Sequence, residues 1–121
     1  MKITLFRNSQ DYKSYAAGET IFRYGDPADV MYVIVEGEVD IVGNTGVVID
    51  SLSEGDLFGE MALVDDSPRS GTALAKTDCK VVPVNRQRFE FMVQNTPHFA
   101  VVVMTIMAER LRRLMAGTTA E

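Results

Sequence analysis

Short apolar segments separated by turn residues occupy the first three-quarters of the chain. Val, Ile, Tyr and Phe gather in these segments, and glycine recurs between them. Segments of this kind are typical of the short strands of a β-sandwich or β-barrel. The clearest predicted strands cover residues 20–23, 30–36, 38–42, 47–52, 72–76 and 79–84.

The spacing of the apolar residues changes near residue 85, where a helical pattern replaces the strand pattern. Asn85 can cap a first helix that runs to about residue 94, with Phe89 on its apolar side. Thr96 and Pro97 then supply a hydroxyl cap and a first-turn proline for a second helix. We expect Gly117 to end that helix.

The second helix carries two apolar sides, of which one follows the i, i+3, i+4, i+7 rule and the other covers only the first half. We therefore expect it to pack against the barrel and against a further surface. The charged residues Glu109 to Arg113 are interpreted as solvated helix surface. The apolar side that follows this rule, here called the apolar stripe, consists of Ala100, Val103, Met104, Met107, Leu111 and Leu114, and the second apolar side consists of Phe99, Val102 and Ile106.

Length, net charge and cysteine content limit the classes of protein to which this chain can belong. A chain of 121 residues can form one core, and its net charge of -5 opposes binding to a nucleic acid backbone. The single cysteine, Cys79, excludes an intramolecular disulfide and suits a reducing compartment. The longest apolar run, residues 99–107, is too short to span a bilayer, and no signal peptide is visible. We expect a cytoplasmic protein with no membrane and no nucleic acid partner.

The candidate chemistry lies between residues 55 and 75. Gly59 lets the backbone turn, and residues 60–64 are long enough for about one helical turn whose first N–H groups are unpaired. Arg69 follows ten residues after Gly59, and the chain re-enters strand structure at residues 70–72. A helix N-terminus, a guanidinium and a hydroxyl together are suited to bind one oxyanion.

Two motifs in this stretch resemble the phosphate-binding cassette of cyclic-nucleotide-binding domains. Residues 58–63 (FGEMAL) and 68–72 (PRSGT) match the two parts of that cassette, and residues 16–41 resemble the opening strands of the family. The resemblance extends over about residues 12–115. It implies a mainly β fold, an eight-stranded jelly-roll β-barrel with a short cassette helix and two C-terminal helices.

The resemblance also implies how the chain is organised and where the ligand binds. Residues 1–121 form one domain, with the barrel at about 12–85 and the helices at about 86–116. The candidate binding residues are Gly59, Glu60, Met61, Ala62, Arg69, Ser70, Gly71 and Thr72.

Individual roles follow from the resemblance. Arg69 pairs with the cyclic phosphate, and the backbone N–H groups of Ala62 and Ser70 complete that site. Glu60 accepts a hydrogen bond from the ribose 2′-hydroxyl, assisted by the backbone of Gly59. The Ser70 hydroxyl can bind the phosphate or a guanine amino group.

The base is expected against apolar strand residues, with Val47 or Val48 as candidates, and under cover of the last helix. One departure concerns Val35, because some family members carry an aspartate two residues before the glycine that matches Gly37. That departure puts in doubt a relay from the arginine to the strands, although it leaves ligand binding in place.

These features predict a cyclic nucleotide sensor, for cAMP or cGMP, whose last helix relays occupancy to a protein effector in trans. Alternatively, two copies of the chain could pair through that helix as a homodimer. The alternative is an interaction module that keeps the fold, binds no ligand and works through the apolar helix. A metal- or heme-dependent jelly roll is disfavoured because His98 and Cys79 are the only strong ligand candidates. Because no Ser–His–Asp set, Gly-Lys-Ser phosphate loop or dinucleotide glycine motif is present, we expect no enzyme.

Overall fold

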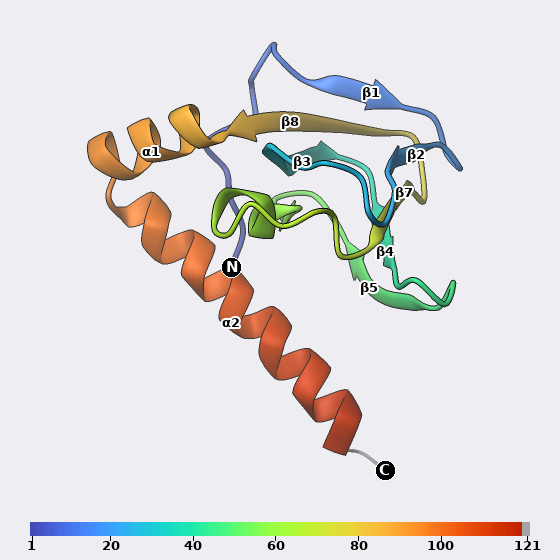
Figure 1. The fold of residues 1–121 in the computed structure, drawn as a ribbon. Coiled ribbons are helices and arrows are strands. Elements are labelled where there is room, and N and C mark those ends of the chain that lie inside the picture. The colour runs from blue at the N-terminus through green and yellow to red at the C-terminus, as the bar shows by residue number, and fades with distance from the viewer. Residues whose placement is uncertain (120–121) are drawn as a thin grey trace.

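Two four-stranded antiparallel sheets form the body of the protein, a computed structural model in which residues 1–119 are described (Figure 1). The first sheet has the strand order β1 (Lys13–Tyr15), β8 (Cys79–Asn85), β3 (Val30–Glu36) and β6 (Leu57–Phe58). The second has the order β2 (Thr20–Phe22), β7 (Thr72–Ala75), β4 (Val39–Val42) and β5 (Val48–Leu52). Apart from β4 and β5, which pair with each other in the second sheet, strands that follow one another in the chain alternate between sheets, as in a jelly roll.

The prediction of an eight-stranded jelly roll is confirmed, and its two sheets do not close into a continuous barrel. Each sheet pairs its own strands, and within residues 1–119 no ladder joins one sheet to the other. The arrangement is a sandwich. The sequence pattern did not predict β1, because Lys13 and Ser14 give this strand no apolar face. The strand is formed by its pairing with β8, in which Tyr15 lies opposite Cys79.

The alternation of side chains along β3 and β8 divides the interior into two cores. Met31 and Val33 point to one side of the first sheet, whereas Tyr32 and Ile34 point to the other. The helix-side core consists of Ile3, Phe6, Met31, Val33, Leu57, Leu63, Val82, Val84, Phe99, Val103 and Ile106. The inter-sheet core consists of Tyr32, Ile34, Val39, Leu52, Phe58, Ala73, Ala75, Cys79 and Val81.

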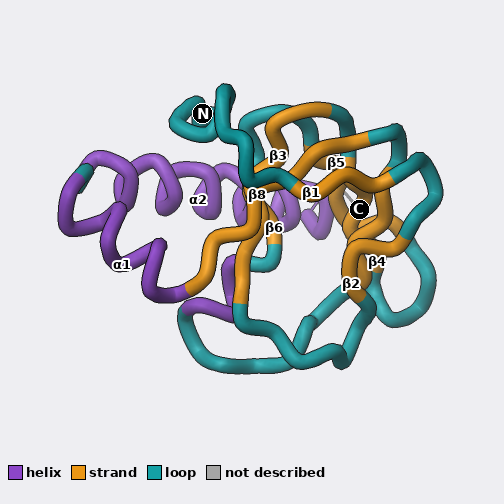
Figure 2. The backbone as a smooth tube through the Cα atoms, turned by 90° about the horizontal axis from the view of Figure 1, so that it is seen from above, coloured by secondary structure: helices purple, strands orange, loops and turns teal. Residues whose placement is uncertain are grey.

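The two C-terminal helices follow directly from β8. Asn85 caps α1 (Arg86–Asn95), because its side chain accepts a hydrogen bond of 2.8 Å from the Arg88 N–H. A bend of 117° separates α1 from α2 (His98–Thr119), and Figure 2 shows both helices beside the strands. Among the described residues no single helix is long and apolar enough to cross a membrane, although the bent pair passes that test by length and composition.

Both predicted ends of α2 differ from the structure. The helix begins at His98, and it is the backbone carbonyl of Thr96 that accepts a hydrogen bond of 2.8 Å from the Phe99 N–H. At the other end the helix continues through Gly117, since that residue has no positive φ and glycine costs only about 1 kcal/mol relative to alanine inside a helix.

The structure shows which of the two predicted apolar sides of α2 packs against the sandwich. Phe99, Val103 and Ile106 pack into the helix-side core, so the second side of the prediction supplies most of the buried face. Met104 and Leu111, assigned to the stripe, are 60% and 57% exposed. Figure 1 shows the N-terminus beside α2, and Ile3 and Phe6 join the same core.

Candidate ligand-binding site

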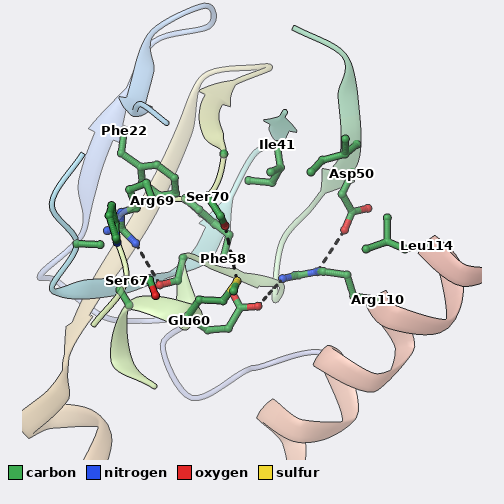
Figure 3. Close-up of a pocket in the computed structure, with 17 residues that line it drawn as sticks. Phe22, Ile41, Asp50, Phe58, Glu60, Ser67, Arg69, Ser70, Arg110 and Leu114 are labelled. Atoms are coloured by element: carbon green, nitrogen blue, oxygen red, sulfur yellow. Dashed lines mark hydrogen bonds and ion pairs between the residues drawn. The ribbon is translucent and has the colours of Figure 1, made fainter. Parts of the chain in front are cut away.

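A pocket lies between the second sheet, the short helix η1 (Glu60–Leu63) and the distal half of α2 (Figure 3). Seven predicted binding residues line it, namely Gly59, Glu60, Met61, Ala62, Arg69, Ser70 and Gly71. Thr72 does not, because its hydroxyl faces the β2–β3 connection and accepts a hydrogen bond of 2.9 Å from the Tyr24 N–H. The two motifs of the sequence therefore meet at one cavity.

Arg69 is the buried cation of this pocket, with only 7% of its surface exposed. Its Nη1 donates to the Gly59 carbonyl at 3.1 Å and its Nη2 to the Val30 carbonyl at 2.8 Å. The backbone is fixed as well, since the Arg69 N–H donates to the Asp26 carbonyl and its own carbonyl accepts from the Gly25 N–H. The arginine is thus held from the β2–β3 connection and from the start of η1.

The charge of Arg69 is incompletely balanced by these contacts. Its Nε is buried without a hydrogen-bond partner, and among the described residues no carboxylate lies within ion-pair distance of the guanidinium. Burial lowers the pKa of Arg69, although nearby carboxylates and Tyr32 oppose that shift. Because an arginine remains charged in proteins, the site contains an unpaired cation that an anion would satisfy.

Gly59 is required where β6 turns into η1. Its φ is 76°, a conformation that favours glycine. A Cβ at this position would lie 2.6 Å from Arg69 Nη1, closer than any side chain tolerates. The helix that follows has one weakly engaged donor at the pocket, because the Ala62 N–H reaches the Gly59 carbonyl at 3.4 Å.

Glu60 faces Arg110 of α2 across the pocket (Figure 3). Arg110 Nη1 lies 3.2 Å from Glu60 Oε1, and Arg110 Nε lies 3.2 Å from Asp50 Oδ2 in ion-pair range but without hydrogen-bond alignment. Arg110 also donates to the Leu57 carbonyl. The three charged side chains are 14–15% exposed. A cation on the last helix therefore pairs with the candidate ribose-binding carboxylate.

Sequence reasoning missed Arg110, because it lies within a run of charged residues that was interpreted as solvated. A signal was present, since Arg110 continues the buried face of Val103 and Ile106 at i+7 and i+4. An arginine on the buried face of a helix needs an acceptor. Asp50 was missed for a similar reason, as it lies on a strand otherwise rich in exposed residues.

The remaining wall of the pocket is apolar. Ile41, Ile49 and Leu114 line it, whereas the predicted base contacts Val47 and Val48 do not. The Ser70 hydroxyl lies at the edge of this region and contacts Met61 Sδ at 3.7 Å. Within residues 1–119, no three His, Cys, Asp or Glu side chains cluster as a metal site would require.

A comparison with protein families supplies the decisive observation. The family model described as "Cyclic nucleotide-binding domain" matches residues 12–96, well over half of the chain. The chain belongs to the cyclic nucleotide-binding domain family. The match contains the sandwich, η1, Arg69 and α1, and it ends before α2.

The chain is similar to regulatory proteins of this family. It is 45% identical, over 82 residues, to a cAMP-dependent protein kinase regulatory subunit of Aspergillus niger. That match covers 66% of this chain but 20% of the relative, so the chain spans about one fifth of the curated relatives that it matches. The relatives are therefore much longer proteins, of which one domain corresponds to this chain.

Solved structures agree with this membership. The catabolite activator protein of Thermus thermophilus superimposes with a TM-score of 0.75 and 28% identity, over 88% of this chain and 52% of that one. The regulatory subunit of a "cAMP-independent protein kinase A" from Trypanosoma brucei gives a TM-score of 0.71 and 26% identity, over 88% of this chain and 38% of that one. The fold is thus shared by proteins that differ in their stated dependence on cAMP.

Proposed function

We propose that this chain is a regulatory binding domain for a purine cyclic nucleotide and has no catalytic activity of its own. The observation that carries the proposal is the Arg69 guanidinium, which is buried at the pocket with an unpaired Nε and no carboxylate partner among the described residues. A cyclic phosphate carries one negative charge and two exposed oxygens, which suits the parallel donors of a guanidinium. We propose that residues 1–121 act as a single cytoplasmic domain of this kind.

Each part of the nucleotide has a counterpart in the pocket. The phosphate is placed at Arg69, with the N–H groups of Ala62 and Ser70 as further donors. The ribose 2′-hydroxyl donates to Glu60, and the base lies against the apolar wall formed by Ile41, Ile49 and Leu114. We place cAMP ahead of cGMP because the similar kinase regulatory subunits are named as cAMP-dependent.

The relay to α2 is proposed to begin at Glu60. A ribose hydroxyl on Glu60 competes with Arg110, which now lies 3.2 Å from that carboxylate. A ligand shifts the position of α2 only as far as it binds one position better than another. The ligand therefore acts on the helix by changing which groups share the carboxylate.

The partner is proposed to be a protein effector in trans, and a kinase catalytic chain is one candidate because the similar relatives are kinase regulatory subunits. A second copy of the chain is another candidate. Val101, Met104, Leu111 and Met115 are exposed on α2 and recur at the alternating three- and four-residue spacing of a coiled-coil seam, with Ala108 between them.

A second candidate function is a protein-interaction module that binds no cyclic nucleotide. The similarity to a regulatory subunit described as cAMP-independent favours keeping this candidate. An interaction module would have the same fold and the same apolar face on α2, but the charge of Arg69 would have no role in its function.

Isothermal titration calorimetry separates the two candidates. The protein is titrated with cAMP, cGMP and 5′-AMP, after nucleotide that co-purifies has been removed and identified. We expect a cyclic nucleotide to bind and 5′-AMP not to bind. Arg69→Ala should then weaken binding about 10- to 100-fold, because a charge-assisted hydrogen bond is lost. Arg112→Ala, at an exposed position on α2, is the matched control. The absence of heat with both cyclic nucleotides would support the interaction module.

A further inference from the structure

The Arg69 guanidinium lies on a cluster of three aromatic rings, two of which it approaches. Phe22, Tyr32 and Phe58 contact one another, with ring centroids 5.3–6.1 Å apart. Arg69 Cζ lies 4.0 Å from the centroid of the Phe22 ring and 5.9 Å from that of Tyr32. Phe22 is thus the ring in direct contact with the cation, and Figure 3 shows the two side chains together at the pocket.

The hydrogen bonds of Arg69 fix only part of the guanidinium. The carbonyls of Gly59 and Val30 each accept one hydrogen bond, from Nη1 and Nη2 respectively. Two such bonds leave the group free to tilt about the line that joins them. An aromatic face at 4.0 Å opposes that tilt, because the negative face of the ring attracts the cation and supports its plane.

Phe22 is itself held in a defined orientation. Phe22 lies at the end of β2, where the pairing with β7 shifts in register between Thr20 and Phe22. Phe58, almost fully buried, contacts the ring of Phe22 at 5.9 Å and a tilt of 37°. The cation therefore lies on a ring that is itself packed from below.

We infer that Phe22 is a positioning residue for anion binding, because its ring fixes the plane of the Arg69 guanidinium before a ligand arrives. The inference rests on the proposed function and extends it to a residue outside both cassette motifs. A guanidinium that is already oriented loses less conformational freedom when the phosphate binds. An aliphatic side chain at position 22 would fill the space but would lack the negative ring face.

Affinity for the cyclic nucleotide tests this inference. Phe22→Leu should weaken the binding of cAMP or cGMP, measured by calorimetry, roughly 2- to 30-fold, whereas Phe22→Tyr should keep it within about twofold of the original protein. Phe89→Leu is the matched control, because Phe89 is a partly buried ring that packs on Phe99 away from the pocket. Affinity that is equal for Phe22→Leu and the original protein would overturn the inference.

A double-mutant cycle shows whether Phe22 acts through the guanidinium. In an Arg69→Lys background the loss caused by Phe22→Leu should shrink, because the planar group that the ring supports is gone. An undiminished loss would assign Phe22 a packing role and contradict the inference.

A measurement without ligand separates this inference from the proposed function. In the NMR spectrum of the free protein, the Arg69 Nε–H signal should show a ring-current shift that Phe22→Leu removes and Phe22→Tyr retains. If the original protein binds neither cyclic nucleotide but shows this pattern, the proposed function fails and the positioning by Phe22 stands. If it binds a cyclic nucleotide but the signal is unchanged in Phe22→Leu, the inference fails alone.

Discussion

Arg110 on the last helix and Glu60 on η1 are separated by 50 residues in the chain, yet their charged groups lie 3.2 Å apart at the pocket. Asp50 lies on the other side of Arg110, so one cation is shared by two carboxylates. This arrangement joins the sandwich to the distal half of α2 through charged groups that are mostly buried.

Arg110→Met should loosen that half of the helix. Loss of the charged contacts to Glu60 and Asp50 is expected to reduce the free energy of unfolding by about 1.5–3 kcal/mol, measured by urea denaturation. Hydrogen exchange in α2 beyond Met107 should become faster, and ligand should no longer change it. Arg112→Met, at an exposed neighbouring position, should leave both quantities unchanged. Equal exchange rates in the two variants would contradict the role given to Arg110.

Gly59→Ala should abolish most of the ligand affinity. Both Gly59 and Gly46 have positive φ, so alanine at either position is expected to cost about 1–3 kcal/mol of stability. Only at Gly59 would the added Cβ press on Arg69, because nothing lies within 4 Å of a Cβ at Gly46. Calorimetry should therefore show a loss of roughly tenfold or more for Gly59→Ala, and little change for Gly46→Ala. Similar affinities for both variants would mean that the contact with Arg69 does not matter.

Leu111→Glu should abolish self-association. Leu111 lies in the exposed seam of α2, where a buried charge would oppose the pairing of two copies. Sedimentation velocity should show a dimer of the original protein that grows with concentration and a monomer for the variant. Phe91→Glu, which changes an exposed apolar residue on α1, is the control and should still dimerise. A monomeric original protein at all concentrations would exclude the homodimer.

The Cys79 thiol should not react in the folded protein. Burial raises the pKa of Cys79, which is only 2% exposed, so little thiolate forms and reagents cannot reach it. A thiol reagent such as dithionitrobenzoate at about pH 8 should label it only after denaturation. Thr45→Cys places a second thiol in an exposed turn and should label at once. Rapid labelling of the original protein would show that the inter-sheet core opens readily.

The parts of the fold that sequence predicted well depend on local signals. Asn85 caps α1 as expected, because the cap is decided by a side chain and an N–H three residues apart. The two halves of the cassette could be recognised because Gly59 and Arg69 lie close together in the chain and each has a specific chemical requirement. The strands with alternating polar and apolar residues could likewise be predicted from their own sequence, without knowledge of the strands that they pair with.

What the sequence missed depends on contacts between distant segments. The pairing of Arg110 with Asp50 and Glu60 is invisible in a run of charges. The sequence did not decide which side of α2 packs against the sandwich, because two apolar sides satisfy the same helical periodicity and only the packed sheet selects between them. The closure of the barrel was also undecided by the strand pattern, since sandwich and barrel share the same alternation.

The attachment of α2 differs along its length, because the half near Phe99 and Ile106 is held by apolar packing and the distal half largely by the guanidinium groups of Arg110 and Arg113. Dissolved ions hardly affect apolar packing or the mostly buried ion pairs of Arg110, whereas they weaken the contact of Arg113, which is 56% exposed, with Asp50. The attachment of the distal half therefore has one part that is sensitive to salt, at Arg113, and one part that resists it, at Arg110.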